Sequence, residues 1–499
     1  VRGGLIIEKK NSRDYPLNKI AERTIGRERK ISDNKFSGVG LEHAFGKELR
    51  GKNGIQLMQK ISNGKWKPIS STNKIEPVSG SDIVTTINVG FQDITHHSLL
   101  EQLERFEADH GTAVVMETAT GEIKAISNLG RTSEGKYYER LNYAVGEHFE
   151  PGSTFKLMSI IAALEDDKVD MNTVVDTENG VLSFYGAKVR DSKKGGYGKI
   201  SLNEVFKLSS NTGIVKIINE AYKEDPKKFS NRLYNMGLNN KLGLSILGES
   251  SPKIPHPNDK DWSGLSLPWM VYGYGVLLSP LQILTFYNAV ANNGEMVKPI
   301  FRKKNTLISN KIILNPSICS KSTLDNVKLM LENVVNEDGG TGSNIKSDIY
   351  KIAGKTGTGQ VDYTTDNVQY ISSFVGYFPA DKPKYSCIVV IHKPNKSKGY
   401  YGSTVAAPVF KKIADKIYSL TPEKVELDNL RIEDFEKIKL TNSIKIDGSD
   451  FSIIKGKNFR NVLPVLENLG FEVIFKGNGS LVKNYRINKS LNKVEIELI

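Results

Sequence analysis

Residues 150–156 read Glu-Pro-Gly-Ser-Thr-Phe-Lys and lead into an apolar run, Leu-Met-Ser-Ile-Ile-Ala-Ala-Leu, at 157–164. A Pro-Gly pair ends an extended segment, and a serine directly after it can open a helix. Ser153 and Lys156 are three positions apart, so a helix places both on one face. A serine hydroxyl needs a base to remove its proton, and a lysine can serve only where burial or another cation makes it neutral. The stretch therefore predicts a nucleophilic serine at the start of a core helix.

The S-x-x-K pattern is not specific by itself, because a chain rich in Ser and Lys contains it repeatedly. It also occurs at Ser32/Lys35, Ser71/Lys74, Ser250/Lys253 and Ser452/Lys455. Only Ser153 combines a Pro-Gly entry with a following helix of core character. An ordinary helix cap remains the alternative interpretation of this serine.

Two further motifs offer polar side chains to the same kind of chemistry. Lys355-Thr356-Gly357-Thr358 contains the only K-[ST]-G sequence in the chain. On an edge strand its glycine would permit close approach of another chain, while Lys and Thr offer donors to a carboxylate. Ser209-Ser210-Asn211 lies between two helical patterns and can project a hydroxyl and an amide into one cleft. A solvated strand end and a polar helix junction are the structural alternatives.

In the order S-x-x-K, S-x-N, K-T-G, the three motifs resemble the signature set of penicillin-binding proteins and serine β-lactamases. The middle motif is Ser-Ser-Asn instead of Ser-Asp-Asn. Other stretches resemble class B penicillin-binding proteins of the cell-division type: 2–3, 40–42, 111–117 with 120–128, 273–275 with 279–282, 291–294 and 339–342. The last ~50 residues resemble a PASTA domain, a small wall-binding module of about this size. The resemblance covers nearly the whole chain.

The residues predict an α+β fold. Hairpins are expected at 112–117/122–127 and 370–378/385–392, with a helical region between them, so that both halves of the chain close one sheet. The resemblance implies the penicillin-binding transpeptidase fold, an antiparallel sheet with helices on both faces plus an all-helical subdomain. The expected domains are a linker or pedestal (dimerisation-like) region at 1–81, the transpeptidase domain at 82–422, a linker at 423–446 and an α/β PASTA-like module at 447–499.

Local signals place individual helices and strands. Ser279-Pro280 predicts a helix start and Gly294 its end. Ser322 with Asp325 resembles a capping box before another helix. In the last module a helix is expected at 458–469, although Pro464 falls inside it, with strands at 471–475 and 494–498.

The resemblance implies a role for each matching residue. Ser153 attacks the carbonyl of a D-Ala-D-Ala stem peptide and Lys156 takes its proton. Ser209 relays a proton to the leaving D-alanine and Asn211 binds substrate amides. Lys355 supplies positive charge, while Thr356 and Thr358 of the Thr356-Gly357-Thr358 segment bind the terminal carboxylate. The backbone N–H groups of Ser153 and Thr358 form the oxyanion hole.

Composition narrows the remaining possibilities. The net charge of +13 suggests an anionic neighbourhood, but the charges are scattered and nucleic-acid motifs are absent, so nucleic-acid binding is not expected. Cys319 and Cys387 form no disulfide or metal spacing, and Cys387 is expected in the core. The seven histidines show no paired-ligand spacing, and His96-His97 is expected on a solvated helix face. We expect no metal, nucleotide or other cofactor.

The leading functional hypothesis is a peptidoglycan DD-transpeptidase. We expect β-lactams to acylate its Ser153 and to stay bound. A DD-carboxypeptidase or β-lactamase using water is the first alternative, and a wall-binding scaffold or sensor the second. No segment reaches the ~18 apolar residues of a membrane helix, and the chain begins at Val1, so we expect a fragment or processed form. The resemblance implies a single-pass membrane anchor, an extracytoplasmic (periplasmic) catalytic domain, and partnership with a glycan polymerase and division proteins.

Overall fold

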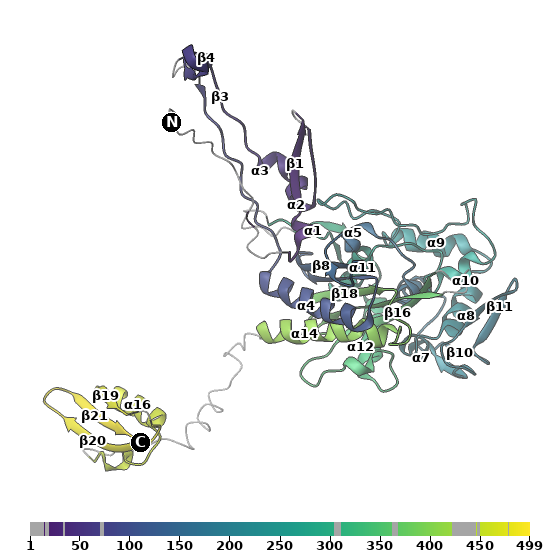
Figure 1. Ribbon diagram of the computed structural model, residues 1–499. Helices are drawn as coiled ribbons and strands as arrows, with labels where there is room; N and C mark the ends of the chain where they lie inside the picture. The colour runs from purple at the N-terminus through teal and green to yellow at the C-terminus, as the bar shows by residue number, and fades with distance from the viewer. Residues whose placement is uncertain are drawn as a thin grey trace. The chain divides into compact units, whose positions relative to one another are not determined.

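A computed structural model describes residue 14 and residues 19–32, 35–69, 74–303, 311–361, 368–421, 446, 450–477 and 479–499 of the 499-residue chain. The chain divides into two compact units, residues 1–420 and 421–499 (Figure 1). Each unit has its own hydrophobic core, and each is described by itself below.

A six-stranded antiparallel sheet forms the centre of the first unit. Its strands, in spatial order, are β16 (Ala353–Val361), β17 (Gln369–Phe378), β18 (Tyr385–His392), β7 (His110–Glu117), β8 (Ile123–Arg131) and β9 (Tyr137–Tyr138). Both predicted hairpins are confirmed, and pairing of β18 with β7 joins the late strands to the early ones. β16 lies at one edge of the sheet, so among the described residues one side of its backbone has no strand neighbour.

Helices cover both faces of this sheet. On β18, Ser386 donates a hydrogen bond to Asn288 of α11 (Pro280–Ala291) at 2.6 Å. Phe374 of β17, which pairs with Val389, packs edge-to-face on Phe410 of α14 (Ala407–Leu420). Side chains alternate along a strand, and positions 386 and 389 have opposite parity. Therefore α11 and α14 lie on opposite faces, with α4 (Val89–Phe106) packed beside α14 (Figure 1).

The region between β9 and β16 is mainly helical. Its helices are α5 (Tyr143–Gly146), the 3₁₀ turn η2 (Gly152–Phe155), α6 (Lys156–Glu165), α7 (Leu202–Lys207), α8 (Asn211–Tyr222), α9 (Pro226–Asn235), α10 (Ser266–Met270), α11, α12 (Lys321–Asn336) and η3 (Ser343–Ile345). It also carries three short strand pairs: β10 (Val174–Asp176) with β13 (Lys199–Ser201), β11 (Val181–Phe184) with β12 (Ala187–Arg190), and β14 (Met296–Val297) with β15 (Ile313–Asn315). Of these pairs, β11 and β12 form a hairpin, whereas the strands of the other two pairs are separated by longer segments.

One of the two predicted helix starts is confirmed and the other is wrong. Ser279 caps α11 in a capping box with Gln282. For α12 the cap is Ser320, whose hydroxyl accepts the Thr323 N–H at 3.3 Å, so the predicted cap Ser322 lies inside the helix. Ser320 has the extended backbone that a cap requires, and its hydroxyl also donates to Glu165 at 2.7 Å.

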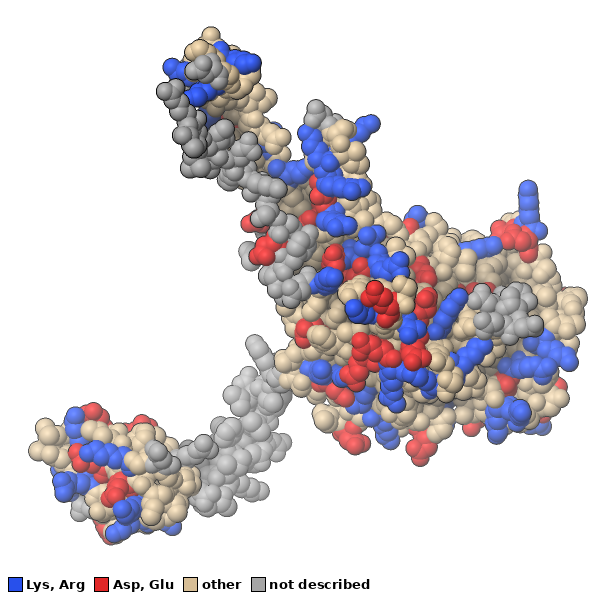
Figure 2. All heavy atoms as spheres, viewed as in Figure 1, with Lys and Arg blue, Asp and Glu red and all other residues tan. Residues whose placement is uncertain are grey.

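The N-terminal part of the first unit consists of short elements. They are α1 (Glu22–Ile25), β1 (Arg27–Ser32), β2 (Lys35–Val39), α2 (Gly40–Ala44), α3 (Gly46–Leu49), β3 (Ile55–Gln56), β4 (Met58–Lys60), η1 (Ser62–Gly64), β5 (Trp66–Pro68) and β6 (Lys74–Ile75). A salt bridge of 2.7 Å joins Glu48 to Arg302, and the Arg23 N–H donates to Glu139 at 2.8 Å. On the face of each unit seen in Figure 2, basic and acidic side chains are interspersed, as the sequence predicts.

The second unit contains a three-stranded sheet, one helix and a 3₁₀ turn, η5 (Ser452–Ile454). The predicted helix is confirmed as α16 (Phe459–Asn468), which continues through Pro464. The predicted strands are β19 (Glu472–Lys476) and β21 (Lys493–Leu498), which pair in parallel. A further strand, β20 (Val482–Asn488), lies antiparallel to β21. The buried core comprises Phe451, Ile454, Val462, Leu466, Val482, Val494, Ile496 and Leu498.

Two remaining expectations concern the core and the membrane. Cys387 is fully buried in β18, and Cys319 is 8% exposed; both thiols are free. The predicted linker at 423–446 lies almost wholly outside the described residues. Within the described ranges, every helix is too short or too polar to cross a bilayer.

Candidate active site

Elements from three distant parts of the sequence bring the three motifs together. η2 carries Ser153, α6 begins at Lys156, the junction between α7 and α8 carries Ser209 and Asn211, and β16 carries Lys355. η2 packs directly against β16. The predicted helix start is a 3₁₀ turn followed by an α-helix, which keeps Ser153 and Lys156 one turn apart.

Glycines allow η2 to approach β16 and its neighbouring loop. A Cβ on Gly357 would come within 2.2 Å of Ser373 Oγ and 2.9 Å of a Thr154 methyl carbon. Gly273, at φ +87°, lies against Gly152, where a Cβ would be 2.3 Å from the carbonyl oxygen. The backbone contacts at Gly273 exclude any side chain there, and at Gly357 a methyl group would meet two side chains of the packed turn and strand. The glycine of the K-T-G motif therefore permits close packing of the nucleophile turn on the strand.

Lys156 is completely buried and donates three hydrogen bonds. Its Nζ lies 2.7 Å from the Ser209 carbonyl oxygen, 2.7 Å from Asn211 Oδ1 and 3.2 Å from Ser209 Oγ. Burial lowers the pKa of Lys156 to about 7, although the Asp191 carboxylate partly offsets this. Desolvation disfavours the ammonium form, so near neutral pH a substantial fraction of Lys156 is a neutral amine.

Lys355 is the second buried lysine of the site. Its Nζ donates to Ser209 Oγ at 2.9 Å and to the Thr356 carbonyl at 3.0 Å, and it lies 5.6 Å from the centre of the Phe206 ring. Burial and the positive charge of Lys156 hold the pKa of Lys355 well below its ordinary value. Ser209 Oγ is therefore the point at which both lysines meet.

Ser209 itself has an unusual backbone. Its φ is +56°, in the left-handed region that non-glycine residues rarely adopt. The following residue, Ser210, caps α8 by accepting the Gly213 N–H at 2.9 Å. This turn directs both the carbonyl and the hydroxyl of Ser209 at Lys156, and such strained conformations are concentrated at functional sites.

Asp191 is a site residue that the sequence analysis missed. Its carboxylate accepts the backbone N–H groups of Asn211 at 2.6 Å and Thr212 at 2.9 Å, and the hydroxyls of Ser210 at 3.1 Å and Thr212 at 2.6 Å. It therefore fixes the S-x-N turn at the positive end of α8. Asp191 directly follows β12, a surface hairpin strand, and no local motif marks it in the sequence.

The second half of β16 carries hydroxyl and backbone N–H groups that could bind a substrate. Thr356 Oγ1 donates to Thr341 Oγ1 at 2.8 Å, and Thr358 Oγ1 accepts the Gly402 N–H at 3.0 Å. The Gln360 N–H donates to the Tyr274 hydroxyl at 2.9 Å, on the side away from β17. N–H groups two residues apart in a strand point to the same side, so the Thr358 N–H also points to the open edge, toward η2.

The structure thus gathers the motif residues at one place, with Asp191 and Thr341 added. The fold and this site define a serine acyl-transferase: a hydroxyl on a helix turn, two buried amines and an open strand edge. The chain matches the family described as penicillin-binding protein transpeptidase domain over residues 111–415 and the penicillin-binding protein dimerisation domain over residues 2–85.

Individual relatives agree with this match. The chain is 30% identical over 431 residues to the peptidoglycan D,D-transpeptidase FtsI of Buchnera aphidicola subsp. Baizongia pistaciae, covering 84% of this chain and 71% of the relative. It is 28% identical over 475 residues to stage V sporulation protein D of Bacillus subtilis, covering 90% and 70% respectively. The transpeptidase domain of Burkholderia pseudomallei penicillin-binding protein 3 superposes with a TM-score of 0.59 at 29% identity, covering 68% of this chain and 96% of that one. The chain belongs to the class B penicillin-binding proteins and is a serine-type transpeptidase.

Proposed function

We propose that Ser153 forms an acyl-enzyme with the D-Ala-D-Ala end of a peptidoglycan stem peptide and passes the acyl group to an amine of a neighbouring peptide. The observation that carries this proposal is the complete burial of Lys156 one turn from Ser153, with its pKa lowered to about 7. A base with a pKa near the working pH combines a populated neutral form with useful basicity.

The hydrogen bonds of Lys156 suggest how it is oriented as a base. The Ser209 carbonyl and Asn211 Oδ1 can only accept hydrogen bonds, and both lie 2.7 Å from Nζ. A neutral amine has two N–H donors, and these two acceptors engage both. The lone pair is then left for a hydroxyl donor, so it can take the proton of Ser153 as that oxygen attacks the carbonyl carbon.

Ser209 and Lys355 can complete the proton transfer. Ser209 Oγ lies 3.2 Å from Lys156 Nζ and 2.9 Å from Lys355 Nζ, so a proton on Lys156 can pass through this hydroxyl to the leaving amine of D-alanine. A substrate carboxylate bound at Thr356 and Thr358 would favour the charged form of Lys355 by direct attraction. Substrate binding would thereby favour protonation of Lys355, which burial otherwise disfavours.

The oxyanion hole would consist of the backbone N–H groups of Ser153 and Thr358. The outward direction of the Thr358 N–H and the contact between η2 and β16 support this assignment. Preorganised donors at such a position are commonly worth about 3–4 kcal/mol each in the transition state. Asn211 would bind substrate amides through its side-chain amide, which now donates to the Arg190 carbonyl at 2.8 Å.

An amine, not water, is the proposed acceptor. Rapid hydrolysis of an acyl-enzyme needs a base for water, and the carboxylate that influences Lys156 is Asp191. Both Asp191 oxygens already accept hydrogen bonds from the S-x-N turn. A carboxylate held in this way is not free to activate water, so Asp191 does not supply the carboxylate base of a β-lactamase.

A labelling experiment tests the proposal. Wild-type protein and Ser153→Ala are incubated with a fluorescent penicillin, and intact mass is measured after β-lactam treatment. We expect one adduct on the wild type that persists for many minutes and none on Ser153→Ala. Equal labelling of both proteins would refute the assignment, an unlabelled wild type would favour a scaffold, and rapid loss of the adduct with turnover of a chromogenic cephalosporin would favour a hydrolase.

The cellular setting is proposed from resemblance and from the relatives. We place the transpeptidase domain at 82–422, a pedestal at 1–81, a linker at 423–446 and a PASTA-like module at 447–499. The protein would act in septal wall synthesis on the outer side of the cytoplasmic membrane, held by a single-pass anchor, together with a glycan polymerase and division proteins. Fractionation of cells producing the complete gene product, with crosslinking at the septum, tests this placement.

A further inference from the structure

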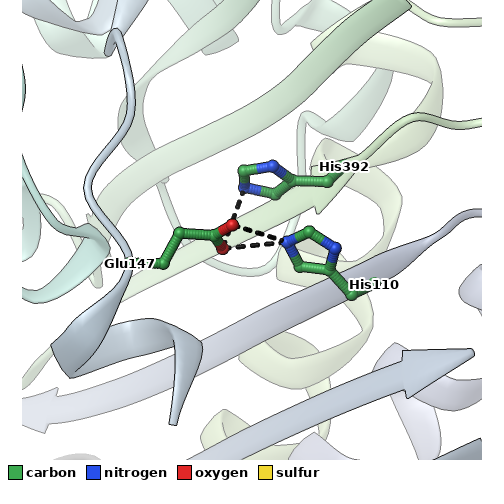
Figure 3. A group of neighbouring side chains, drawn as sticks. All are labelled: His110, Glu147 and His392. Carbon is green, nitrogen blue, oxygen red and sulfur yellow. Dashed lines mark hydrogen bonds and ion pairs between the residues drawn. The ribbon is translucent and has the colours of Figure 1, made fainter. Parts of the chain in front are cut away.

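Three side chains with metal-binding atoms meet outside the site described above (Figure 3). His110 is the first residue of β7, His392 is the last residue of β18, and Glu147 follows α5. His110 and His392 are paired neighbours across the two strands, and their rings stack with centroids 4.2 Å apart. Their donor atoms and those of Glu147 all lie within 4.8 Å of one another.

Glu147 lies between the two imidazole rings. Its carboxylate is 2.8 Å from His110 Nε2 and 3.6 Å from His392 Nε2. His392 is only 6% exposed, and its Nε2 has no hydrogen-bond partner among the described residues although it points at the carboxylate. A buried nitrogen without a hydrogen-bond partner lowers the stability of the folded state, and a bound ligand would remove this cost.

The other nitrogen of His110 is held by a carboxylate. Asp109 Oδ2 lies 2.9 Å from His110 Nδ1. In metal sites, a ligating histidine usually donates its second N–H to such a group, which fixes the tautomer and raises the basicity of the ligating nitrogen. Asp109 therefore orients His110 so that Nε2 faces Glu147 and His392.

We infer that His110, Glu147 and His392 form a binding site for a divalent transition-metal ion of the zinc type. Two imidazole nitrogens and one carboxylate oxygen suit this class of ion and leave a fourth position for water. Tetrahedral zinc with ligands at ~2.0–2.1 Å holds its donors roughly 3.3 Å apart. The most widely separated donors would approach one another by at most about 1.5 Å, and the His110 and Glu147 donors, now 2.8 Å apart, would separate slightly. The two stacked rings would tilt so that both nitrogens point at the ion.

An ion can reach this position from solvent. The Glu147 side chain is 30% exposed and lines a cavity of about 500 Å³ together with Tyr143 and Gly146. Tyr143 also stacks on the outer side of His110, at 4.3 Å between ring centres. Tyr143 therefore both packs on the cluster and lines the cavity through which Glu147 is exposed.

An ion bound at this site would restrain the segment that carries the nucleophile Ser153. Glu147 lies six residues before Ser153, in the segment that leads into η2. An ion held by Glu147 and by the ends of β7 and β18 would link this segment to two central strands. The proposal is independent of the acyl-transfer chemistry, because none of its ligands belongs to the active site.

Zinc binding to the tag-free full chain tests this inference. Protein stripped with a chelator and dialysed is titrated with Zn²⁺ by calorimetry, and Co²⁺ absorption reports the coordination geometry. We expect one tight site in the wild type, its loss in His392→Gln and Glu147→Gln, and about 10- to 100-fold weaker binding in Asp109→Asn. The melting temperature should rise with Zn²⁺ in the wild type and not in the ligand variants.

His97→Gln is the matched control, because this histidine is 58% exposed on α4 and pairs with Asp93. It should bind zinc as the wild type does. Cooperative thermal unfolding in the absence of added metal verifies that each variant is folded. A wild type without a stoichiometric site, or ligand variants that are folded and still bind zinc with unchanged affinity, would overturn the inference and leave the cluster as a His110–Glu147 ion pair.

Discussion

Lys156 and Lys355 donate to the same oxygen, Ser209 Oγ, at 3.2 and 2.9 Å. Both amines are fully buried, and two positive charges this close repel each other strongly in a medium of low dielectric. The pKa of each lysine is lowered, so the pair does not carry two full charges near neutral pH. The shared hydroxyl connects the proposed base to the strand that would receive the substrate carboxylate.

The rate of acylation should increase with pH through about pH 7. The pKa of Lys156 is lowered to about 7, and only the neutral amine can accept the Ser153 proton, so protonation below this pH removes the base. The second-order rate constant for a β-lactam without a group titrating in this range, measured from pH 5.5 to 8.5, checks the prediction. Lys156→Arg keeps its charge at every pH and should be inactive throughout. A flat profile would contradict the role of Lys156.

Asp191→Asn should slow acylation while leaving the protein folded. The asparagine side chain has no negative charge, so it binds the Asn211 and Thr212 N–H groups more weakly than the Asp191 carboxylate does. Hydrogen bonds to charged groups are worth about 1.5–3 kcal/mol. If this loss appears in the transition state, kcat/KM falls about 10- to 100-fold. The fall should lie mainly in the acylation step and not in initial binding. Asp261→Asn, whose side chain is 70% exposed, is the control and should be unchanged.

Gly357→Ala should destabilise the protein and abolish acylation. The added methyl would overlap Ser373 Oγ, which can rotate, and the Thr154 methyl carbon, which is buried and held by the hydrogen bond from Thr154 to the Pro151 carbonyl. Relief of the second overlap requires η2 to shift from β16. Overpacking of this kind typically costs about 1–3 kcal/mol, which thermal unfolding can measure. Gly90→Ala on α4 is the control, because its Cβ would meet only Asn88 Oδ1 at 3.4 Å. A variant at position 357 with normal stability and labelling would show that close packing here is dispensable.

Removal of residues 422–499 should leave acylation intact. The second unit has its own core, and the active-site residues all belong to the first. A chain ending at Thr421 should therefore react with fluorescent penicillin at a rate within about twofold of the full chain. The isolated 446–499 segment should show cooperative thermal unfolding. A truncated chain that is folded but unreactive would indicate that the second unit contributes to the site.

Much of the site could be predicted because each motif is local. Ser153 and Lys156 are one helical turn apart, Ser209 and Asn211 share one turn, and Lys355 lies with Thr356 and Thr358 in one strand. Such spacings depend on backbone geometry that neighbouring residues dictate. Their assembly in space was inferred from the family resemblance, and the hydrogen bonds of Lys156 agree with it.

The residues that were missed act across long sequence separations. Asp191 reaches the S-x-N turn from a hairpin about 20 residues earlier, and no periodicity signals this. His110 and His392 are 282 positions apart and become neighbours only through the pairing of β7 with β18, so a search for local ligand spacing cannot find them. The wrong prediction of Ser322 as a helix cap has a different cause. Two nearby serines could each cap α12, and the hydrogen bond from the Ser320 hydroxyl to the Glu165 carboxylate favours Ser320.

The two native thiols have a practical consequence. Cys387 is inaccessible in β18, and burial raises the pKa of Cys319 to about 12, so neither offers a thiolate to an alkylating reagent. A cysteine introduced at an exposed position would then be the single reactive sulfur in the folded chain. Fluorophores on two such cysteines, one in each unit, could follow the separation of the units during turnover without removal of either native cysteine.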